Sequence, residues 1–315
     1  MPEYLLSTPA FCRAHPMKTP ESETILITGA SGFLGWNLCR VAAATCRVVA
    51  VVNTRRIDIP NAKVVAADLT RHADVMRLLD AARPGAVVHA AAMADPNACE
   101  THPRESHTIN VDAAAALAAE CGRRELPFAF ASTDLVFDGL HAPYREDDAP
   151  HPVMLYGRQK VQAEGEIRRV HPRAVICRLP LMFGDPGPAA KSFIQPMIAA
   201  ILEGREPRLF TDEYRSPVGA LSAARGILHM LATQQGTTVH LGGRQRISRY
   251  DFGLLLSRLM GKEGAVRLIA TRQCDVVMPA ARPPDVSLDS AKAYALGYDP
   301  MDAEEELAAV QGIRG

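Results

Sequence analysis

Short apolar runs alternate with longer amphipathic segments through the first 180 residues. The apolar runs predict buried strands at 25–28, 48–52, 64–67, 87–90, 128–132 and 174–179. Helices are expected between them, at about 33–44, 73–82, after residue 110, and at 155–170. Continuous apolar strands separated by helices are typical of a parallel sheet covered on both faces. The pattern therefore predicts an α/β protein with a Rossmann-type, doubly wound sheet.

The character of the chain changes after about residue 184. Residues 185–188 predict a loop, whereas 221–232 and 237–241 predict a helix and a strand that return to the sheet. We expect a cofactor-binding domain over 21–184 plus about 217–241, and a smaller substrate lobe over about 185–216 and 242–315. Residues 1–20 are expected to form a flexible leader, with Met17 as an alternative start.

The bulk composition excludes several function classes. With 35 basic and 35 acidic residues the formal net charge is zero, so no general attraction to nucleic acid or anionic membranes is expected. The seven cysteines are scattered without a CxxC, which favours a reducing cytoplasm and no metal site. No apolar run reaches the roughly 18 residues of a membrane span, and the start lacks the features of a signal peptide.

A glycine-rich turn follows the first strand directly. In the sequence 28–35, TGASGFLG, Gly29 would permit a tight turn, Gly32 a close approach of the backbone to a pyrophosphate, and Gly35 the packing of helix on strand. The N–H groups at the start of the next helix would then hold the phosphates. The strand before and the helix after this turn indicate a dinucleotide site.

The end of the second strand bears on which dinucleotide binds. A carboxylate there would bind a ribose 2′-hydroxyl, but the chain has Asn53-Thr-Arg55-Arg56. Adjacent arginines suit a 2′-phosphate, which favours NADP over NAD. The alternative is that both arginines are solvated and Asp58 reaches back to the ribose.

Tyr156 and Lys160 lie four residues apart in the predicted helix 155–170, so both side chains share one helical face. An exposed Tyr/Lys neighbour pair is the alternative interpretation. Downstream of a dinucleotide turn, the pair indicates hydride-transfer chemistry.

These features together resemble the extended short-chain dehydrogenase/reductases. Within them the chain is similar to the dTDP-4-dehydrorhamnose reductase group, which also includes the regulatory beta subunit of methionine adenosyltransferase. The resemblance covers residues about 24 to 300. It is carried by TGASGFLG at 28–35, Asp68-Leu69, HAAA at 89–92, NVD at 110–112, STDLVFDG at 132–139, PYRED at 143–147, YGRQK at 156–160, RLPLMFG at 178–184, RSP at 215–217 and Arg282-Pro283.

The resemblance implies cofactor contacts by position. It places Asp68 and Leu69 beside the adenine, and Leu179 and Pro180 near the nicotinamide. Lys160 would bind the nicotinamide ribose, and Asn110 would either support it through water or only stabilise a helix start. The expected cofactor residues are Gly29, Ser31, Gly32, Phe33, Leu34, Gly35, Arg55, Asp68, Leu69, Ala90, Ala91, Ala92, Asn110, Lys160, Leu179 and Pro180.

For the chemistry, the resemblance implies that Tyr156 is the general acid of a carbonyl reduction. The pKa of tyrosine is ordinarily near 10, and we expect the Lys160 ammonium to lower it. Thr133 would hydrogen-bond the substrate oxygen, with Ser132 as its rival. Leucine after Asp134 removes the acidic pair that sugar dehydratases carry, which favours simple reduction.

Substrate contacts are expected at Met93, Asp134, Arg215 and Arg282, with the two arginines holding a nucleotide-sugar diphosphate. Three functions remain open. The first is an NADP-dependent 4-keto nucleotide-sugar reductase, the second a regulatory subunit that binds NADP without turnover, and the third a nucleotide-sugar epimerase. The segment from Met93 to Asn97 departs from rhamnose-pathway reductases towards the regulatory branch. Homodimers are common in the family, although no interface can be read from the residues.

Overall fold

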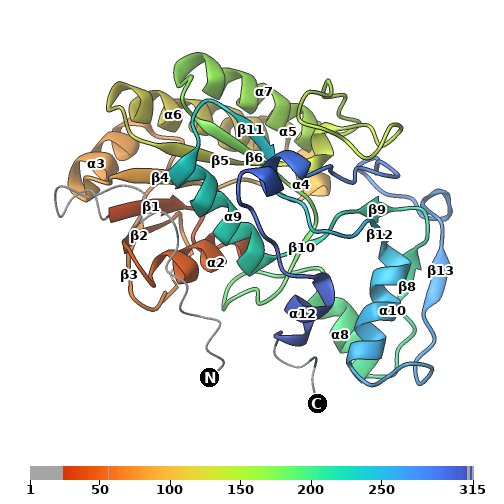
Figure 1. The fold of residues 1–315 in the computed structure, drawn as a ribbon. Helices are drawn as coiled ribbons and strands as arrows, with labels where there is room; N and C mark the ends of the chain where they lie inside the picture. The colour runs from red at the N-terminus through yellow and green to blue at the C-terminus, as the bar shows by residue number, and fades with distance from the viewer. Residues whose placement is uncertain (1–23, 56, 311–312, 314–315) are drawn as a thin grey trace.

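The computed structural model describes residues 24–55, 57–310 and 313. A seven-stranded parallel sheet with helices on both faces forms most of the molecule, and a smaller lobe flanks it (Figure 1). This confirms the predicted α/β, doubly wound fold. The expected leader at 1–20, the alternative start Met17 and the neighbouring arginine at 56 lie outside the described residues.

The sheet reverses its order of strands at the glycine turn. Its order is β11-β6-β5-β4-β1-β2-β3, and every pairing is parallel. Successive strands therefore run outward from β1 in one direction and from β4 in the other, which places a crevice at the carboxyl ends of β1 and β4. The strands are β1 (Thr24–Thr28), β2 (Arg47–Val52), β3 (Ala62–Ala66), β4 (Ala86–His89), β5 (Phe128–Thr133), β6 (Val175–Leu179) and β11 (Thr238–His240).

Two apolar layers cover the sheet because alternate residues of each strand face opposite sides. In β1, Ile25 and Ile27 face one layer and Leu26 faces the other. The first layer contains α2 (Phe33–Ala42) and α9 (Ala220–Thr233). The second contains α3 (His72–Ala82), α6 (Ala113–Arg123) and α7 (Leu155–Val170). The predicted helix at 221–232 and strand at 237–241 thus do return to the sheet domain.

The segment before α6 differs from the prediction. Helix α4 (Pro96–Thr101) is followed by α5 (Pro103–His107) and by the π-helical turn η3 (Thr108–Asp112), which leads directly into α6. The helix therefore begins well before Asn110, which lies inside the π-helical turn. The alternative that Asn110 stabilises a helix start is wrong for this reason.

The smaller lobe has its own apolar core. It contains α8 (Ile194–Leu202), α10 (Arg249–Leu259), α12 (Ala303–Ala308) and the short strand pairs β8 (Arg208–Phe210) with β13 (Ile269–Thr271) and β9 (Tyr214–Arg215) with β12 (Ile247–Ser248). The pair β7 (Met182–Phe183) with β10 (Val218–Gly219) connects it to the sheet domain. No helix in the described residues is long and apolar enough to cross a bilayer.

Not all of the segment after residue 242 packs in the smaller lobe, as the prediction had it. Ala293 in α11 (Ala291–Ala295) and the following Tyr298 are buried in the apolar layer of α2 and α9. The C-terminal segment therefore contributes to both parts, passing back over the sheet domain before α12 joins the lobe (Figure 1).

Candidate functional site

The glycine turn between β1 and α2 has the shape that its sequence predicts. Gly29 adopts φ +68°, and a Cβ built on it would lie 2.7 Å from the Ala91 backbone. A Cβ on Gly35 would lie 2.1 Å from the Gly29 carbonyl oxygen. Both positions therefore require glycine, the first for its backbone conformation and the second for close packing. Gly32 precedes the first turn of α2, where no side chain caps the helix.

A cavity of about 260 Å³ opens in front of this turn, at the carboxyl ends of β1, β2 and β4. It brings together half of the predicted cofactor residues, namely Gly29, Ser31, Gly32, Asp68, Leu69, Ala90, Ala91 and Ala92. Asn53, which the sequence placed at the end of the second strand, also lines it, as do Thr70, Ile109 and Ala113, which sequence reasoning missed. Glycines at a helix start, free first-turn N–H groups and an apolar cleft beside them fit the diphosphate and adenosine of a dinucleotide.

Other predicted cofactor residues lie outside this cavity. Phe33 and Leu34 form the first turn of α2, with Leu34 buried in the core. Arg55 is exposed, and its guanidinium donates a hydrogen bond to the Ala189 carbonyl. Pro180 directly follows Leu179, the last residue of β6. Their contacts with a cofactor remain predictions.

Asp68 also has a local structural role. Its carboxylate accepts hydrogen bonds from the backbone N–H and the hydroxyl of Thr70, at 3.0 and 2.6 Å. These bonds lower the pKa of Asp68 below its usual value. The carboxylate thus organises the turn after β3 as well as lining the cavity.

Helix α7 and the end of β5 bring the predicted catalytic side chains into one region. Tyr156 and Lys160 lie on the buried face of α7, and the Lys160 Nζ donates to the Ala131 carbonyl at 2.7 Å. The same ammonium lies 5.9 Å from the centre of the Tyr156 ring. A Cβ on Gly157 would meet the Leu135 carbonyl at 2.1 Å, so the helix approaches the chain just after Thr133 very closely.

The prediction that the pKa of Tyr156 is lowered is wrong for the protein without bound cofactor. Burial, with smaller contributions from Cys99 and Asp134, raises the pKa of Tyr156 well above its usual value of 10. Desolvation disfavours the phenolate more strongly than the nearby ammonium favours it. The structure therefore holds Tyr156 as a neutral phenol, the form that can donate a proton.

Thr133 and Ser132, the two rival hydroxyls, have different partners. The Ser132 hydroxyl is buried and donates to Glu164 at 2.5 Å. The Thr133 hydroxyl donates to Asp134 at 3.1 Å and accepts from the Leu135 N–H, so it caps the short helix η4 (Asp134–Val136). Thr133 as the substrate-facing hydroxyl stays a prediction. It would have to turn its O–H from Asp134 to the substrate oxygen, whereas turning the Ser132 O–H would take a hydrogen bond from the Glu164–Arg178 ion pair.

Asn110 ties three segments together beside helix α7. Its amide accepts from the Met93 N–H at 2.8 Å and donates to the Met93 carbonyl at 3.1 Å. It also donates to Gln159 of α7 at 2.8 Å. Met93, Cys99 and Tyr156 belong to one small apolar cluster. Asn110 therefore fixes the loop after β4 against the helix that carries Tyr156.

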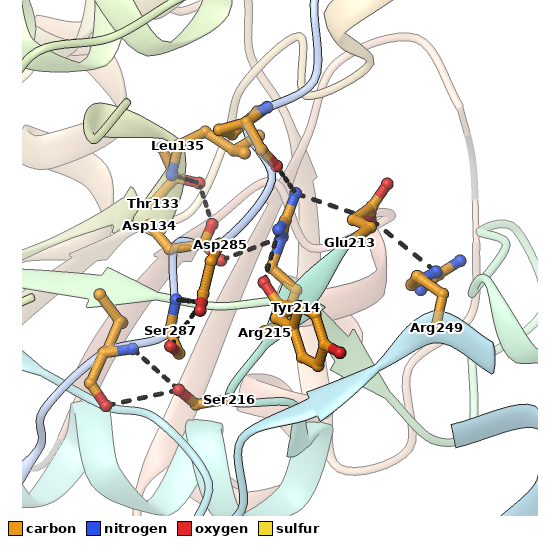
Figure 2. Close-up of polar contacts among 12 residues, drawn as sticks. Thr133, Asp134, Leu135, Glu213, Tyr214, Arg215, Ser216, Arg249, Asp285 and Ser287 are labelled. Carbon is orange, nitrogen blue, oxygen red and sulfur yellow. Dashed lines mark hydrogen bonds and ion pairs between the residues drawn. The ribbon is translucent and has the colours of Figure 1, made fainter. Parts of the chain in front are cut away.

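Arg215 differs from the expectation of an accessible cation. It is only 4% exposed, and its guanidinium donates to the backbone carbonyls of Tyr214 and Pro283 at 2.6 and 3.2 Å. Its Nε lies 3.8 Å from Asp134, and its Nη2 lies 3.6 Å from Glu213. Figure 2 shows this guanidinium between the two carboxylates. Arg215 thus links the two parts of the molecule, which the sequence did not reveal.

Asp134 is buried with one oxygen, Oδ2, lacking a hydrogen-bond partner. Burial raises the pKa of Asp134 to about 6, against the lowering effects of Arg215 and Thr133.

Arg249 lies on the far side of Glu213, and its buried Nη1 lacks a hydrogen-bond partner (Figure 2). Burial lowers the pKa of Arg249 to about 10, with smaller lowering contributions from Arg215 and the half-buried Arg282, while Glu213 opposes the shift. Sequence reasoning missed Arg249, which no motif marked.

The RmlD substrate binding domain family matches residues 23–311. The probable low-salt glycan biosynthesis reductase Agl14 of Haloferax volcanii is 32% identical over 291 residues, covering 90% of this chain and 96% of that protein. Methionine adenosyltransferase 2 subunit beta of Danio rerio is 29% identical over 229 residues, covering 71% of this chain and 70% of that protein.

A solved structure shares the fold. The dTDP-4-dehydrorhamnose reductase of Bacillus anthracis, in complex with NADP, superposes with a TM-score of 0.78 at 22% identity, covering 90% of this chain and 97% of that one. The family match spans both the glycine turn and the lobe beyond it, in agreement with the resemblance of the motifs. The chain belongs to the RmlD substrate binding domain family, within the extended short-chain dehydrogenase/reductases.

Proposed function

We propose that the protein is an NADP-dependent reductase of a 4-keto nucleotide sugar. The observation that carries this proposal is that Tyr156 and Lys160 share the buried face of α7, which packs against the chain just after Thr133, at the sheet edge that also holds the cavity in front of the glycine turn. Family membership and a relative named as a glycan biosynthesis reductase support it. NADP is favoured by Arg55 and by the missing carboxylate after β2, and NAD is the alternative.

The proposed reaction reduces a carbonyl to an alcohol. Bound NADPH would supply the hydride to the carbonyl carbon. Thr133 would hold the carbonyl oxygen by redirecting its hydroxyl from Asp134, and Tyr156 would transfer its phenolic proton to that oxygen. The Lys160 ammonium would stabilise the phenolate that remains. These steps balance, since one hydride and one proton enter and the alcohol leaves.

Two arginines of the smaller lobe favour a nucleotide sugar as the substrate class. Arg282 and Arg249 are proposed to bind the diphosphate, with Arg215 holding Asp134 and Glu213 in place behind them. Met93, in the apolar cluster of Tyr156, would contact the sugar.

The test is NADPH oxidation with dTDP-4-dehydrorhamnose and related keto sugars. Tyr156→Phe should lower kcat at least about 100-fold while NADPH binding persists, because only proton donation is removed. Tyr250→Phe, on α10 of the smaller lobe, is the matched control and should retain activity. Unchanged turnover in Tyr156→Phe would refute the assigned mechanism.

The identity with the methionine adenosyltransferase beta subunit favours a second candidate, a regulatory subunit without turnover. It predicts tight NADP binding, no activity across the keto-sugar panel, and co-purification with a partner enzyme. Turnover without added NADPH, by cofactor retained through purification, would instead indicate an epimerase.

A further inference from the structure

Helix α7 carries a third polar side chain on the face of Tyr156 and Lys160. Glu164 lies one further turn along and is 2% exposed. Lys160 donates to the carbonyl of Ala131, and Glu164 accepts from the hydroxyl of Ser132. The ammonium and the carboxylate thus contact successive residues of β5 without being hydrogen-bonded to each other.

Arg178 of β6 occupies both oxygens of Glu164. Its Nε donates to Oε1 at 3.1 Å and its Nη2 donates to Oε2 at 2.8 Å. Its Nη1 lies 3.4 Å from Nε2 of His240, whose Nδ1 is 3.1 Å from the Tyr144 carbonyl. Burial lowers the pKa of His240 to about 3, so this imidazole is neutral and its Nε2 accepts from Arg178. Each nitrogen of the Arg178 guanidinium and each carboxylate oxygen of Glu164 therefore has a hydrogen-bond partner.

Few charges surround Lys160. Burial lowers the pKa of Lys160 to about 8, and Glu164 is the main group that opposes this. His89 on β4 is neutral because burial lowers its pKa to about 3. Cys99 on α4 is a neutral thiol, and Tyr156 a neutral phenol, because burial raises both pKa values. In the described part of the chain, Glu164 is thus the carboxylate whose charge acts most strongly on this ammonium.

We propose that Glu164 and Arg178 are positioning residues for Lys160. Arg178 holds both carboxylate oxygens, so Glu164 stabilises the ammonium from a distance but does not bind it and draw it out of the catalytic region. This inference rests on the proposed function, since it explains how the Tyr156–Lys160 pair of that reductase is kept in place and charged.

The proposal predicts opposite effects of the two partners. In Glu164→Gln the ammonium loses its counter-charge, and it should lose its proton at a pH about one unit lower. In Arg178→Met the freed carboxylate can pair with Lys160, and the proton should be lost at a pH about one unit higher. A merely structural salt bridge would not shift the two variants in opposite directions.

The readout is NADPH affinity, followed by NADPH fluorescence from pH 6 to 10 without sugar, because the Lys160 ammonium would bind the nicotinamide ribose. We expect affinity to fall on the alkaline side, with the midpoint lower in Glu164→Gln and higher in Arg178→Met. Glu166→Gln is the matched control, since Glu166 lies on the same helix but pairs with the surface residue Arg169. Its midpoint should equal that of the unsubstituted protein.

A double variant covers the case in which a single variant does not fold. Glu164→Gln with Arg178→Met removes both charges of the buried ion pair together, so no unpaired guanidinium or carboxylate is left, and its midpoint should still lie below that of the unsubstituted protein. Midpoints that move in the same direction in both single variants, or a double variant with an unchanged midpoint, would overturn the proposal. NADPH binding with the predicted shifts but no reduction of any keto sugar would refute only the proposed function.

Discussion

Two buried arginine–carboxylate pairs lie near the carboxyl end of β5, and they are built differently. Arg178 and Glu164 share two hydrogen bonds, with further partners in Ser132 and His240. Arg215 and Asp134 are as deeply buried, yet their closest approach is 3.8 Å, and one oxygen of Asp134 lacks a hydrogen bond.

We interpret the Arg178–Glu164 pair as a structural scaffold and the Arg215–Asp134 pair as part of the proposed site. A buried ion pair offsets its desolvation only when its hydrogen bonds are complete, as around Glu164. Asp134 is desolvated by burial and only partly hydrogen-bonded, so its pKa rises to about 6. Because Asp134 accepts from the hydroxyl of Thr133, its charge also affects the proposed substrate-binding group.

The largest expected effect comes from breaking the complete pair. Glu164→Ala leaves the Arg178 guanidinium buried without its counter-charge, and the free energy of unfolding should fall by about 3–5 kcal/mol. Urea denaturation at pH 7 measures it. Glu166→Ala on the exposed side of α7 should change the free energy by no more than about 0.5 kcal/mol. Equal, small losses in the two variants would show that the complete pair is not a scaffold.

The incomplete pair should appear in the pH dependence of stability. The pKa of Asp134 is about 6 in the folded protein and near 3.9 in an unfolded chain, so folding favours its protonated form. Its contribution is therefore full below pH 4 and is lost as the pH rises through 6, a fall of roughly 2–3 kcal/mol. Urea denaturation between pH 4 and 7 should show this slope in the unsubstituted protein and not in Asp134→Asn. Identical slopes would mean that Asp134 ionises normally.

The sequence predicted the regular parts of the molecule because their causes are local. The apolar runs defined the strands, and Gly29 and Gly35 occupy positions where only glycine fits. The spacing of Tyr156 and Lys160 placed both on one buried helical face. Extending that spacing by four residues reaches Glu164, so this carboxylate was also accessible to the same reasoning.

The partners of the charged side chains could not be predicted in this way. Arg215 and Asp134 are 81 residues apart, and their contact depends on how the lobe folds back onto the sheet. The raised pKa of Tyr156 likewise results from burial by segments distant in sequence. Spacing along one helix brings residues to one face, but the balance between desolvation and charge is set by tertiary packing.

Ser132 and Thr133 offer the smallest comparison. These neighbouring hydroxyls donate to the carboxylates of the two different pairs, Ser132 to Glu164 and Thr133 to Asp134. Ser132→Ala removes one hydrogen bond to a charged group, and the free energy of unfolding should fall by about 1.5 kcal/mol while kcat stays within about twofold. Thr133→Val keeps the side-chain shape but removes the hydroxyl proposed to hold the substrate oxygen, so kcat should fall at least about tenfold. Urea denaturation and steady-state NADPH oxidation, measured on both variants, separate these outcomes. The reverse result would be a lower kcat in Ser132→Ala with Thr133→Val fully active. It would place the substrate oxygen at Ser132, beside Glu164 and Arg178, and contradict the distinction between scaffold and site.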